Sequence, residues 1–306
     1  GMHLQSEQGK TVNRIIKDYN NINIHEILGM PAKDSQYDIS KGYGNLVIEF
    51  SKYWNKNNYD LVLALGDRFE MSAAVQASIP FGVDIAHIHG GETTLGAIDN
   101  IYRHQLSLAS KIHFTTSDEF SKRVIKLIGE TKNVYNVGSL SLDDFEYLKL
   151  PKWTDVCKEF NLPNLPFILV TFHPETVNSD MNKEFTQIIK KTLLFLSKKI
   201  HIIITLSNAD TNGSLYRSIS MELNQDDNIS LVNTFGKLNY FSAMKNSKFL
   251  LGNTSSGIIE AASFNKFVLN VGDRQKGRLA GENVFHIPYD FQQIIDKSIN
   301  LISQGN

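Results

Sequence analysis

Carboxylates follow two apolar, strand-like runs in the first half of the sequence. Leu61–Leu65 is followed by Asp67, and Ile85–His89 is followed by two glycines and Glu92. In open α/β sheets ligands bind beyond the carboxyl ends of the strands, so adjacent strands would bring these two acids together. Two converging carboxylates raise each other's pKa, which suits proton transfer at neutral pH. The pattern therefore predicts acid–base chemistry at Asp67 and Glu92.

These residues also admit other roles. Asp67 could simply be the N-cap of a helix over Glu70–Ile79. His87 and His89 alternate onto one face of their strand, and with Glu92 they form a donor set that zinc could use. The other histidines complete no recognised metal-binding spacing, so we predict no metal site. For His87 we favour a buried structural role.

A helix predicted over Ile98–Ser110 carries Asp99 and Arg103 on one face, four residues apart. Such a pair usually forms a solvated salt bridge. Because this helix follows the glycine-rich strand end, its first turn would face the same site. Asp99 is therefore a third candidate acid.

In the second half, the strand-like run Phe167–Phe172 ends at His173. A single histidine at a strand end is often structural, but this one could donate to a phosphate or act as an acid.

A later apolar run, Phe249–Leu251, is followed by the hydroxyl side chains of Thr254, Ser255 and Ser256 at the start of a predicted helix. Free N–H groups and the helix dipole favour phosphate at such a position. Glu260 lies one turn deeper, placed for ribose hydroxyls. The segment is neither a Walker loop nor a Gly-x-Ser-x-Gly elbow, and a plain helix cap is the alternative.

Three cations lie within Gly272–Arg278, directly after another strand-like run. A charge run is usually solvated surface, but this one contains two glycines and follows a strand. Arg274 has the planar geometry for bidentate phosphate contact.

Alternating apolar runs and amphipathic stretches predict an α/β fold with two Rossmann-like, doubly wound parallel-sheet domains. We place the domains at residues 1–150 and 151–306, because the segment Leu150–Pro166 is polar and contains three prolines, and we expect one short helix within it. The predicted strands are Leu61–Leu65, Ile85–His89, Ile112–Thr115, Val134–Val137, Phe167–Phe172, Ile200–Leu206, Ile229–Val232, Phe249–Leu251 and Phe267–Val271. The predicted helices are Lys10–Tyr19, Leu46–Trp54, Glu70–Ile79, Ile98–Ser110, Glu119–Ile128, Asn182–Lys198, Tyr240–Lys245 and Gly257–Phe264.

Composition restricts the class of partner. The chain has 306 residues, with 31 Lys and Arg against 32 Asp and Glu, so its net charge of −1 gives no global attraction for nucleic acid or an anionic membrane. No apolar run reaches the ~20 residues that span a bilayer. The single cysteine, Cys157, suits a reducing cytosol, so we expect a cytoplasmic protein.

Six motifs together resemble the hydrolysing UDP-N-acetylglucosamine 2-epimerases of sialic acid-type sugar biosynthesis, in order and along nearly the whole chain. They are Gly66-Asp67-Arg68-Phe69-Glu70, His87-Ile88-His89-Gly90-Gly91-Glu92, Ile98-Asp99-Asn100-Ile101-Tyr102-Arg103-His104, Phe172-His173-Pro174-Glu175, Gly252-Asn253-Thr254-Ser255-Ser256-Gly257 and Gly272-Asp273-Arg274-Gln275-Lys276-Gly277-Arg278.

This resemblance implies a GT-B-like fold with the active site in the interdomain cleft. It also implies elimination of UDP across C1 and C2 of the sugar, then addition of water with inversion at C2, giving N-acetylmannosamine and UDP without cofactor or metal. A homo-oligomer, dimer or tetramer, is expected. The catalytic residues implied are Asp67, Glu92, Asp99 and His173; the substrate-binding residues implied are Arg68, His89, Arg103, Asn253, Thr254, Ser255, Ser256, Gly257, Glu260, Arg274 and Gln275.

Family members ordinarily begin with a strand and a nucleotide-contacting loop, and often end in a helix that returns to the first domain. We expect these segments to lie beyond the given sequence. Three alternative functions stay open: a hydrolysing 2-epimerase for a UDP-2,4-diacetamido-2,4,6-trideoxy sugar, a GT-B glycosyltransferase, and a non-catalytic nucleotide-sugar sensor.

Overall fold

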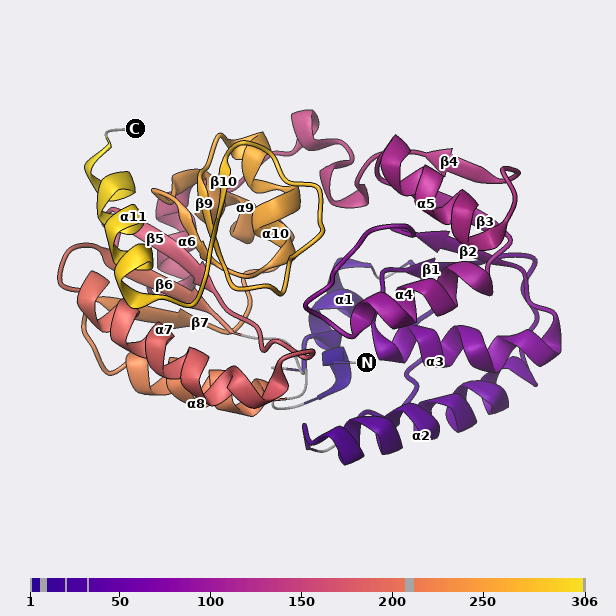
Figure 1. Cartoon of the computed structure of the whole chain (residues 1–306). Helices are drawn as coiled ribbons and strands as arrows, with labels where there is room; N and C mark the ends of the chain where they lie inside the picture. The colour runs from indigo at the N-terminus through magenta and orange to yellow at the C-terminus, as the bar shows by residue number, and fades with distance from the viewer. Residues whose placement is uncertain (1, 6–9, 20, 32, 207–211, 305–306) are drawn as a thin grey trace. The chain divides into compact units, whose positions relative to one another are not determined.

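The computed structural model describes residues 2–5, 10–19, 21–31, 33–206 and 212–304. Its contacts divide the chain into two compact units (Figure 1). Unit 1 contains residues 1–94 and 98–143, and unit 2 contains residues 95–97 and 144–306.

Unit 1 is built on a four-stranded parallel sheet in the order β1-β2-β3-β4. Apolar residues of β1, β2 and the helices α3 and α4 form one core, and α2 packs on α3 to form another. The elements are α1 (Val12–Asp18), α2 (Gln36–Trp54), β1 (Val62–Leu65), α3 (Phe69–Ser78), β2 (Ile85–Ile88), α4 (Asp99–Leu108), β3 (Ile112–Thr115), α5 (Asp118–Ile128) and β4 (Val134–Asn136).

Unit 2 is built on a six-stranded parallel sheet in the order β10-β9-β8-β5-β6-β7. Its elements are α6 (Trp153–Phe160), β5 (Phe167–Thr171), α7 (Asn182–Leu196), β6 (His201–Thr205), α8 (Gly213–Leu223), β7 (Ile229–Val232), α9 (Lys237–Asn246), β8 (Leu250–Gly252), α10 (Ser255–Ile259), β9 (Val268–Val271), β10 (Val284–Ile287) and α11 (Phe291–Ser303).

Helices cover both faces of the unit 2 sheet. Along β5, Ile168 and Val170 belong to a core shared with α7, α8 and α11, while Phe167 and Leu169 belong to a core shared with α6, α9 and α10. Figure 1 shows α7, α8 and α11 gathered on one side of this sheet. Because successive strand side chains point to opposite faces, a strand buried on both faces needs the continuous apolar run that the sequence has here.

In the sheet of unit 2, β6 and β7 lie on one side of β5, and β8, β9 and β10 lie on the other. The order in which strands are added therefore switches sides between β5 and β8, which pair in parallel. The loops that leave two such strands diverge to opposite faces and open a crevice at their carboxyl ends, where ligands bind in α/β sheets. The loops after β5 and β8 are therefore the first place to look for a site in this unit.

The predicted α/β architecture with two parallel sheets is confirmed, and each predicted strand has a counterpart. Three elements were not predicted: β10, α8 and α11. The strand β10 is short and lies at the sheet edge, and His286 interrupts its apolar residues. For α11 a usable signal existed, because the Asp290 side chain caps the helix by accepting from the Gln293 N–H at 2.8 Å.

Candidate functional site

Arg103 organises the strand ends of unit 1. This α4 residue is 1% exposed, and one guanidinium nitrogen, Nη2, pairs with the Asp67 carboxylate after β1. The other, Nη1, donates to the Glu92 carbonyl oxygen at 2.7 Å and to the Thr94 hydroxyl at 2.9 Å, both after β2. Since β1 and β2 are neighbours, one buried cation holds the chain after both strands.

These contacts exclude one alternative role each for Asp67 and Arg103. The N-cap position of α3 is Arg68, not Asp67, and no side chain caps that helix. Capping therefore does not explain Asp67, whose carboxylate is committed to Arg103 instead. The usual alternative for Arg103, a solvated salt bridge along its own helix, does not hold, because the Arg103 side chain is buried. Asp99 is the first residue of α4, one turn before Arg103, and it is half-buried.

Glu92 is 4% exposed and its carboxylate is fixed by two side chains. His89 Nδ1 lies 2.7 Å from Glu92 Oε1, and the Thr116 hydroxyl donates to the same oxygen at 3.3 Å. His89 has a φ of 70°, a left-handed backbone that costs energy for a side chain other than glycine. Thr116 was missed from the sequence, although it follows β3 and strand ends were the positions to inspect.

The second glycine of the motif after β2 is required by its surroundings. Gly91 has a φ of 78°, and a Cβ there would lie 2.2 Å from the Phe120 carbonyl oxygen of α5. The chain therefore turns back over the start of α5 only with glycine at this position. That turn returns Glu92 to the strand-end cluster.

His87 is a core residue, as predicted. It is fully buried, with Nε2 2.8 Å from the Gly66 carbonyl oxygen and Nδ1 3.0 Å from the Ser107 hydroxyl. A carbonyl oxygen only accepts, so Nε2 carries the hydrogen and Nδ1 accepts from Ser107. Burial lowers the pKa of His87 to about 4, against the opposing effect of the Gly66 bond. The imidazole is therefore neutral and ties the end of β1 to α4.

In unit 2, His173 and Asn253 follow the two strands at the switch point. Asn253 is fully buried, and its side chain accepts the His173 N–H at 2.7 Å and donates to the His173 carbonyl oxygen at 2.8 Å. The Gln275 side chain in turn donates to the Asn253 carbonyl oxygen at 2.8 Å. These bonds fix the backbone that carries the imidazole of His173, which is 7% exposed.

The hydroxyl residues after β8 lie at the start of α10. Thr254 is the N-cap, and its hydroxyl accepts the Ser256 N–H at 3.4 Å. The plain capping role is thus present, while Thr254, Ser255 and Ser256 are half-buried. A Cβ at Gly257 would lie 2.9 Å from a Val268 methyl group, so glycine allows α10 to pack closely on β9. Glu260 is the C-cap of this helix and is 8% exposed.

Tyr240 on α9 is a neighbour of this helix that sequence reasoning missed. Burial raises its pKa to about 12, and Ser256, Thr171 and the Glu260 carboxylate lie near its hydroxyl. No strand-end signal marks Tyr240, because it lies in the middle of a helix. Only the packing of α9 brings it to the β5 and β8 ends.

Arg274 and Gln275 are 7% and 3% exposed. Arg274 Nη1 donates to the Pro174 carbonyl oxygen at 2.6 Å, so the loop after β9 is joined to the loop after β5. A hollow of about 400 Å³ lies at the carboxyl ends of β9 and β10; it is lined by Gly272, Asp273, Lys276, Gly277, Arg278, His286, Ile287 and Pro288. Two cations of this motif therefore differ in burial: Arg274 is buried, whereas Lys276 is exposed and pairs with Asp273.

The structure therefore groups the predicted site residues by unit. Asp67, His89, Glu92 and Arg103 are connected by hydrogen bonds in unit 1. His173, Asn253 and Gln275, together with Arg274 through Pro174, are connected in unit 2. Arg68, also after β1, donates from its Nε to the Glu70 carboxylate at 3.2 Å.

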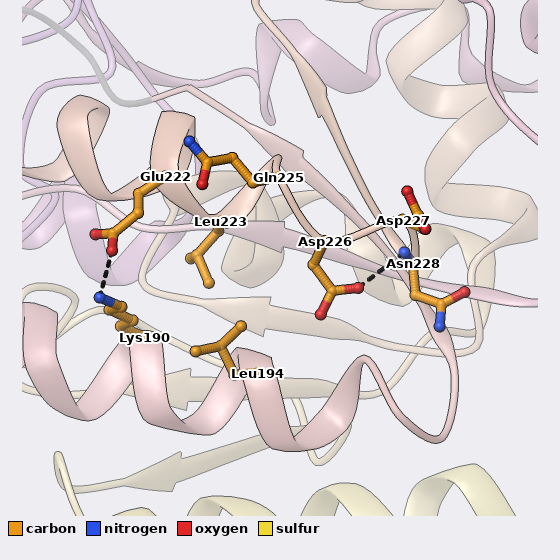
Figure 2. Close-up of a pocket in the computed structure, with 8 residues that line it drawn as sticks. All are labelled: Lys190, Leu194, Glu222, Leu223, Gln225, Asp226, Asp227 and Asn228. Carbon is orange, nitrogen blue, oxygen red and sulfur yellow. Dashed lines mark hydrogen bonds and ion pairs between the residues drawn. The ribbon is translucent and has the colours of Figure 1, made fainter.

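A larger hollow, of about 620 Å³, lies elsewhere on unit 2 (Figure 2); its lining residues are Lys190, Leu194, Glu222, Leu223, Gln225, Asp226, Asp227 and Asn228. It opens beside the loop that leads into β7, at the amino end of that strand. Figure 2 shows Lys190 paired with Glu222 and Asp226 bonded to Asn228. Strand amino ends are not where α/β sheets bind ligands, so we do not assign this hollow to the site.

Among the described residues, no group of three or more His, Cys, Asp or Glu side chains could hold a metal ion. Across the same part of the chain, no helix combines the length and apolar character needed to cross a membrane.

The two parallel-sheet units, with acids, histidines and hydroxyl side chains after their strand ends, define an α/β protein with candidate ligand-binding residues at the carboxyl ends of its strands. The family model described as UDP-N-acetylglucosamine 2-epimerase matches residues 1–306. The chain belongs to this family, as the sequence motifs predicted.

Three curated relatives are similar over nearly the whole chain. A GDP/UDP-N,N'-diacetylbacillosamine 2-epimerase (hydrolyzing) from Campylobacter jejuni is 34% identical, covering 100% of this chain and 77% of the relative. A UDP-N,N'-diacetylbacillosamine 2-epimerase (hydrolyzing) from Legionella pneumophila is 31% identical, covering 96% and 78%. A polysialic acid biosynthesis protein from Escherichia coli is 31% identical, covering 98% and 76%.

Among solved structures, the UDP-GlcNAc 2-epimerase from Neisseria meningitidis bound to UDP-GlcNAc superposes with a TM-score of 0.77 at 19% identity, covering 96% of this chain and 81% of that one. This likeness confirms the GT-B-like fold class predicted from the sequence.

We expect Arg103→Met to lower the free energy of unfolding by about 3 kcal/mol, because it leaves the Asp67 carboxylate and the Glu92 carbonyl without their buried partner. Urea unfolding measures the change. Arg123→Met is the matched control, since its pair with Glu119 is exposed, and it should cost under about 1 kcal/mol. Equal losses in the two variants would contradict the organising role of Arg103.

We expect the His87 imidazole to stay neutral, with hydrogen on Nε2, at pH 6 and to titrate only near pH 4. Because this pKa is depressed in the folded state, the associated stability is present above pH ~6.5 and is lost as the pH falls toward the folded value. Imidazole nitrogen NMR measures the titration, with His87→Gln identifying the signal. A midpoint near 6.5 would contradict the buried assignment.

Proposed function

We propose that the protein is a hydrolysing 2-epimerase acting on a UDP-activated 2-acetamido sugar. A carboxylate removes the C2 proton, the C1–O bond breaks with UDP leaving, and a C1–C2 double bond forms. Water then adds its hydroxyl to C1 and a proton reaches C2 from the opposite face, which releases the free 2-epimer and UDP. The observation that carries this proposal is the Asp67–Arg103–Glu92 cluster in a chain of the 2-epimerase family.

The cluster suits this chemistry because C2–H is weakly acidic and needs a base held in place. Arg103 fixes Asp67 from inside the unit, while His89 and Thr116 fix Glu92. Asp99, at the start of α4, is the third proposed acid–base group. We assign Arg103 to positioning, because its guanidinium is buried and its hydrogen bonds are internal.

Unit 2 is proposed to hold the nucleotide. Thr254, Ser255, Ser256 and Gly257 at the α10 start would contact phosphate, Glu260 would contact ribose, and His173 would act beside the leaving diphosphate. Arg274 is proposed as the phosphate cation. Arg68 and His89 would contact the sugar, whereas the buried Asn253 and Gln275 would hold the loops.

For the sugar, we propose the 2,4-diacetamido-2,4,6-trideoxy type. The relatives at 34% and 31% identity that are named for N,N'-diacetylbacillosamine favour it. The second candidate is UDP-N-acetylglucosamine, with N-acetylmannosamine as the product. It is favoured by the family description and by the relative named for polysialic acid biosynthesis. The two sugars differ at C4 and C6, away from the reacting carbons.

The reaction and substrate are tested by incubating the protein with each UDP-sugar in deuterated water. We expect UDP and a free 2-epimer labelled at C2, with kcat/KM at least about tenfold higher for the diacetamido sugar, because one or two pocket contacts separate such substrates. Preference for UDP-N-acetylglucosamine would overturn the sugar assignment alone. Transfer to an acceptor, or binding without UDP release, would overturn the reaction in favour of a glycosyltransferase or a sensor.

Asp67→Asn and Glu92→Gln should each lower kcat by about 10²–10⁴-fold, because each removes a proton-transfer group. UDP binding, measured by calorimetry, should persist in both. Glu119→Gln, an exposed acid on α5, serves as the control and should leave kcat unchanged. Near-parental kcat in Asp67→Asn and Glu92→Gln would refute their acid–base roles.

A further inference from the structure

Three neighbouring strands of unit 2 end in loops that are tied together by side chains. The strands β5, β8 and β9 pair side by side, and Asn253 binds both backbone groups of His173. The same Asn253 amide donates to the Tyr289 hydroxyl at 3.2 Å. The loops after β5 and β8 are thus joined. The loop after β9 is bound to them through Arg274 and Gln275, and one further tie holds the start of that loop.

Glu175, two residues after His173, supplies that tie. Its carboxylate oxygen Oε1 accepts the Asp273 N–H at 2.7 Å, 98 residues away in sequence. Asn182 holds Glu175 in turn, accepting from its N–H at 3.1 Å and donating to its carbonyl oxygen at 2.8 Å. Glu175 is 1% exposed, so it cannot serve as a surface acid and its contacts lie within the unit.

The turn that Glu175 holds is closely fitted. Gly272 has a φ of 81°, and a Cβ there would lie 2.4 Å from Glu175 Oε1 and 2.3 Å from the Tyr289 ring. Tyr289 is itself stacked on Phe185 at 3.9 Å between ring centroids. Only glycine allows the backbone to approach both groups. Arg274 lies two residues after Gly272, and its guanidinium donates a hydrogen bond to the Pro174 carbonyl oxygen.

We propose that Glu175 is the positioning residue of the nucleotide site, holding the Gly272–Gln275 turn so that Arg274 is set for the UDP diphosphate. The inference rests on the proposed nucleotide site of unit 2. It goes beyond that proposal by making affinity for UDP depend on a buried acid that does not itself contact the ligand.

The surroundings of Glu175 give this tie a pH dependence. Burial raises the pKa of Glu175, and the nearby Asp273 carboxylate adds to the rise, while bonds from the Asp273 and Arg274 N–H groups and Asn178 oppose it. Tyr216 of α8 and Tyr289 also face the carboxylate, and the Arg274 cation lies beside both tyrosines. A raised folded-state pKa means that stability present at low pH is lost as the pH rises through that value.

The proposal is tested by titrating UDP into the full-length protein by calorimetry. We expect Glu175→Ala to weaken UDP binding by about tenfold or more, because it releases a buried hydrogen bond that fixes the turn. Glu175→Gln keeps an acceptor oxygen and should recover part of the loss. The exposed Glu184→Gln on α7 is the control and should bind UDP as the parent does.

A double variant separates positioning from general damage. If Glu175 acts through Arg274, Glu175→Ala combined with Arg274→Ala should bind UDP no more weakly than Arg274→Ala alone. Additive losses, or parental affinity in Glu175→Ala, would overturn the proposal. In addition, the free energy of unfolding of the parent minus that of Glu175→Gln should fall as the pH rises above the ordinary pKa range of glutamate. A difference that stays constant with pH would contradict a raised pKa for the buried Glu175 carboxylate.

Failure of the proposed reaction is distinguishable from failure of this inference. A parent protein that binds UDP but releases none from either UDP-sugar would refute the epimerase, while the affinity measurements would still decide the role of Glu175. A parent protein that binds no UDP would overturn both.

Discussion

Backbone polar groups at the ends of parallel strands are the constraint on which both units depend. Where a buried strand ends, its N–H and C=O groups leave the sheet ladder and need new partners, since an unmade buried hydrogen bond is costly. In unit 1 the partner is Arg103, which binds the Glu92 carbonyl. In unit 2 the partners are Asn253, Asn182 and Glu175. The side chains that satisfy the backbone thereby also fix the residues proposed for chemistry.

The charges of the protein act locally. With a net charge of −1, no overall field concentrates an anionic substrate, so binding has to rely on groups placed within a few ångströms. Buried placement makes those groups effective because it excludes the water that would screen them. Each buried charge also needs a partner of opposite charge, and Asp67 is that partner for Arg103. His87 solves the same problem by remaining neutral.

The sequence determined the kind of structure and the positions to inspect. Short apolar runs such as Phe167–Phe172 alternate with amphipathic stretches, and this pattern predicted parallel sheets connected through helices. The rule that ligands bind at strand carboxyl ends then directed attention to Asp67, Glu92, His173 and Arg274. The six motifs predicted the family, which the family model confirms.

Tertiary structure alone decided which of those residues meet. The sequence placed Arg103 beside Asp99 on one helix, whereas packing of α4 turned it inward to Asp67, 36 residues away. Thr116, Tyr240 and Glu175 acquire their partners only when strands and helices from distant parts of the chain come together. Local sequence specifies backbone preference and periodicity, and these fix the elements. A hydrogen bond between remote side chains depends instead on the order of strands in the sheet, which local preference does not encode.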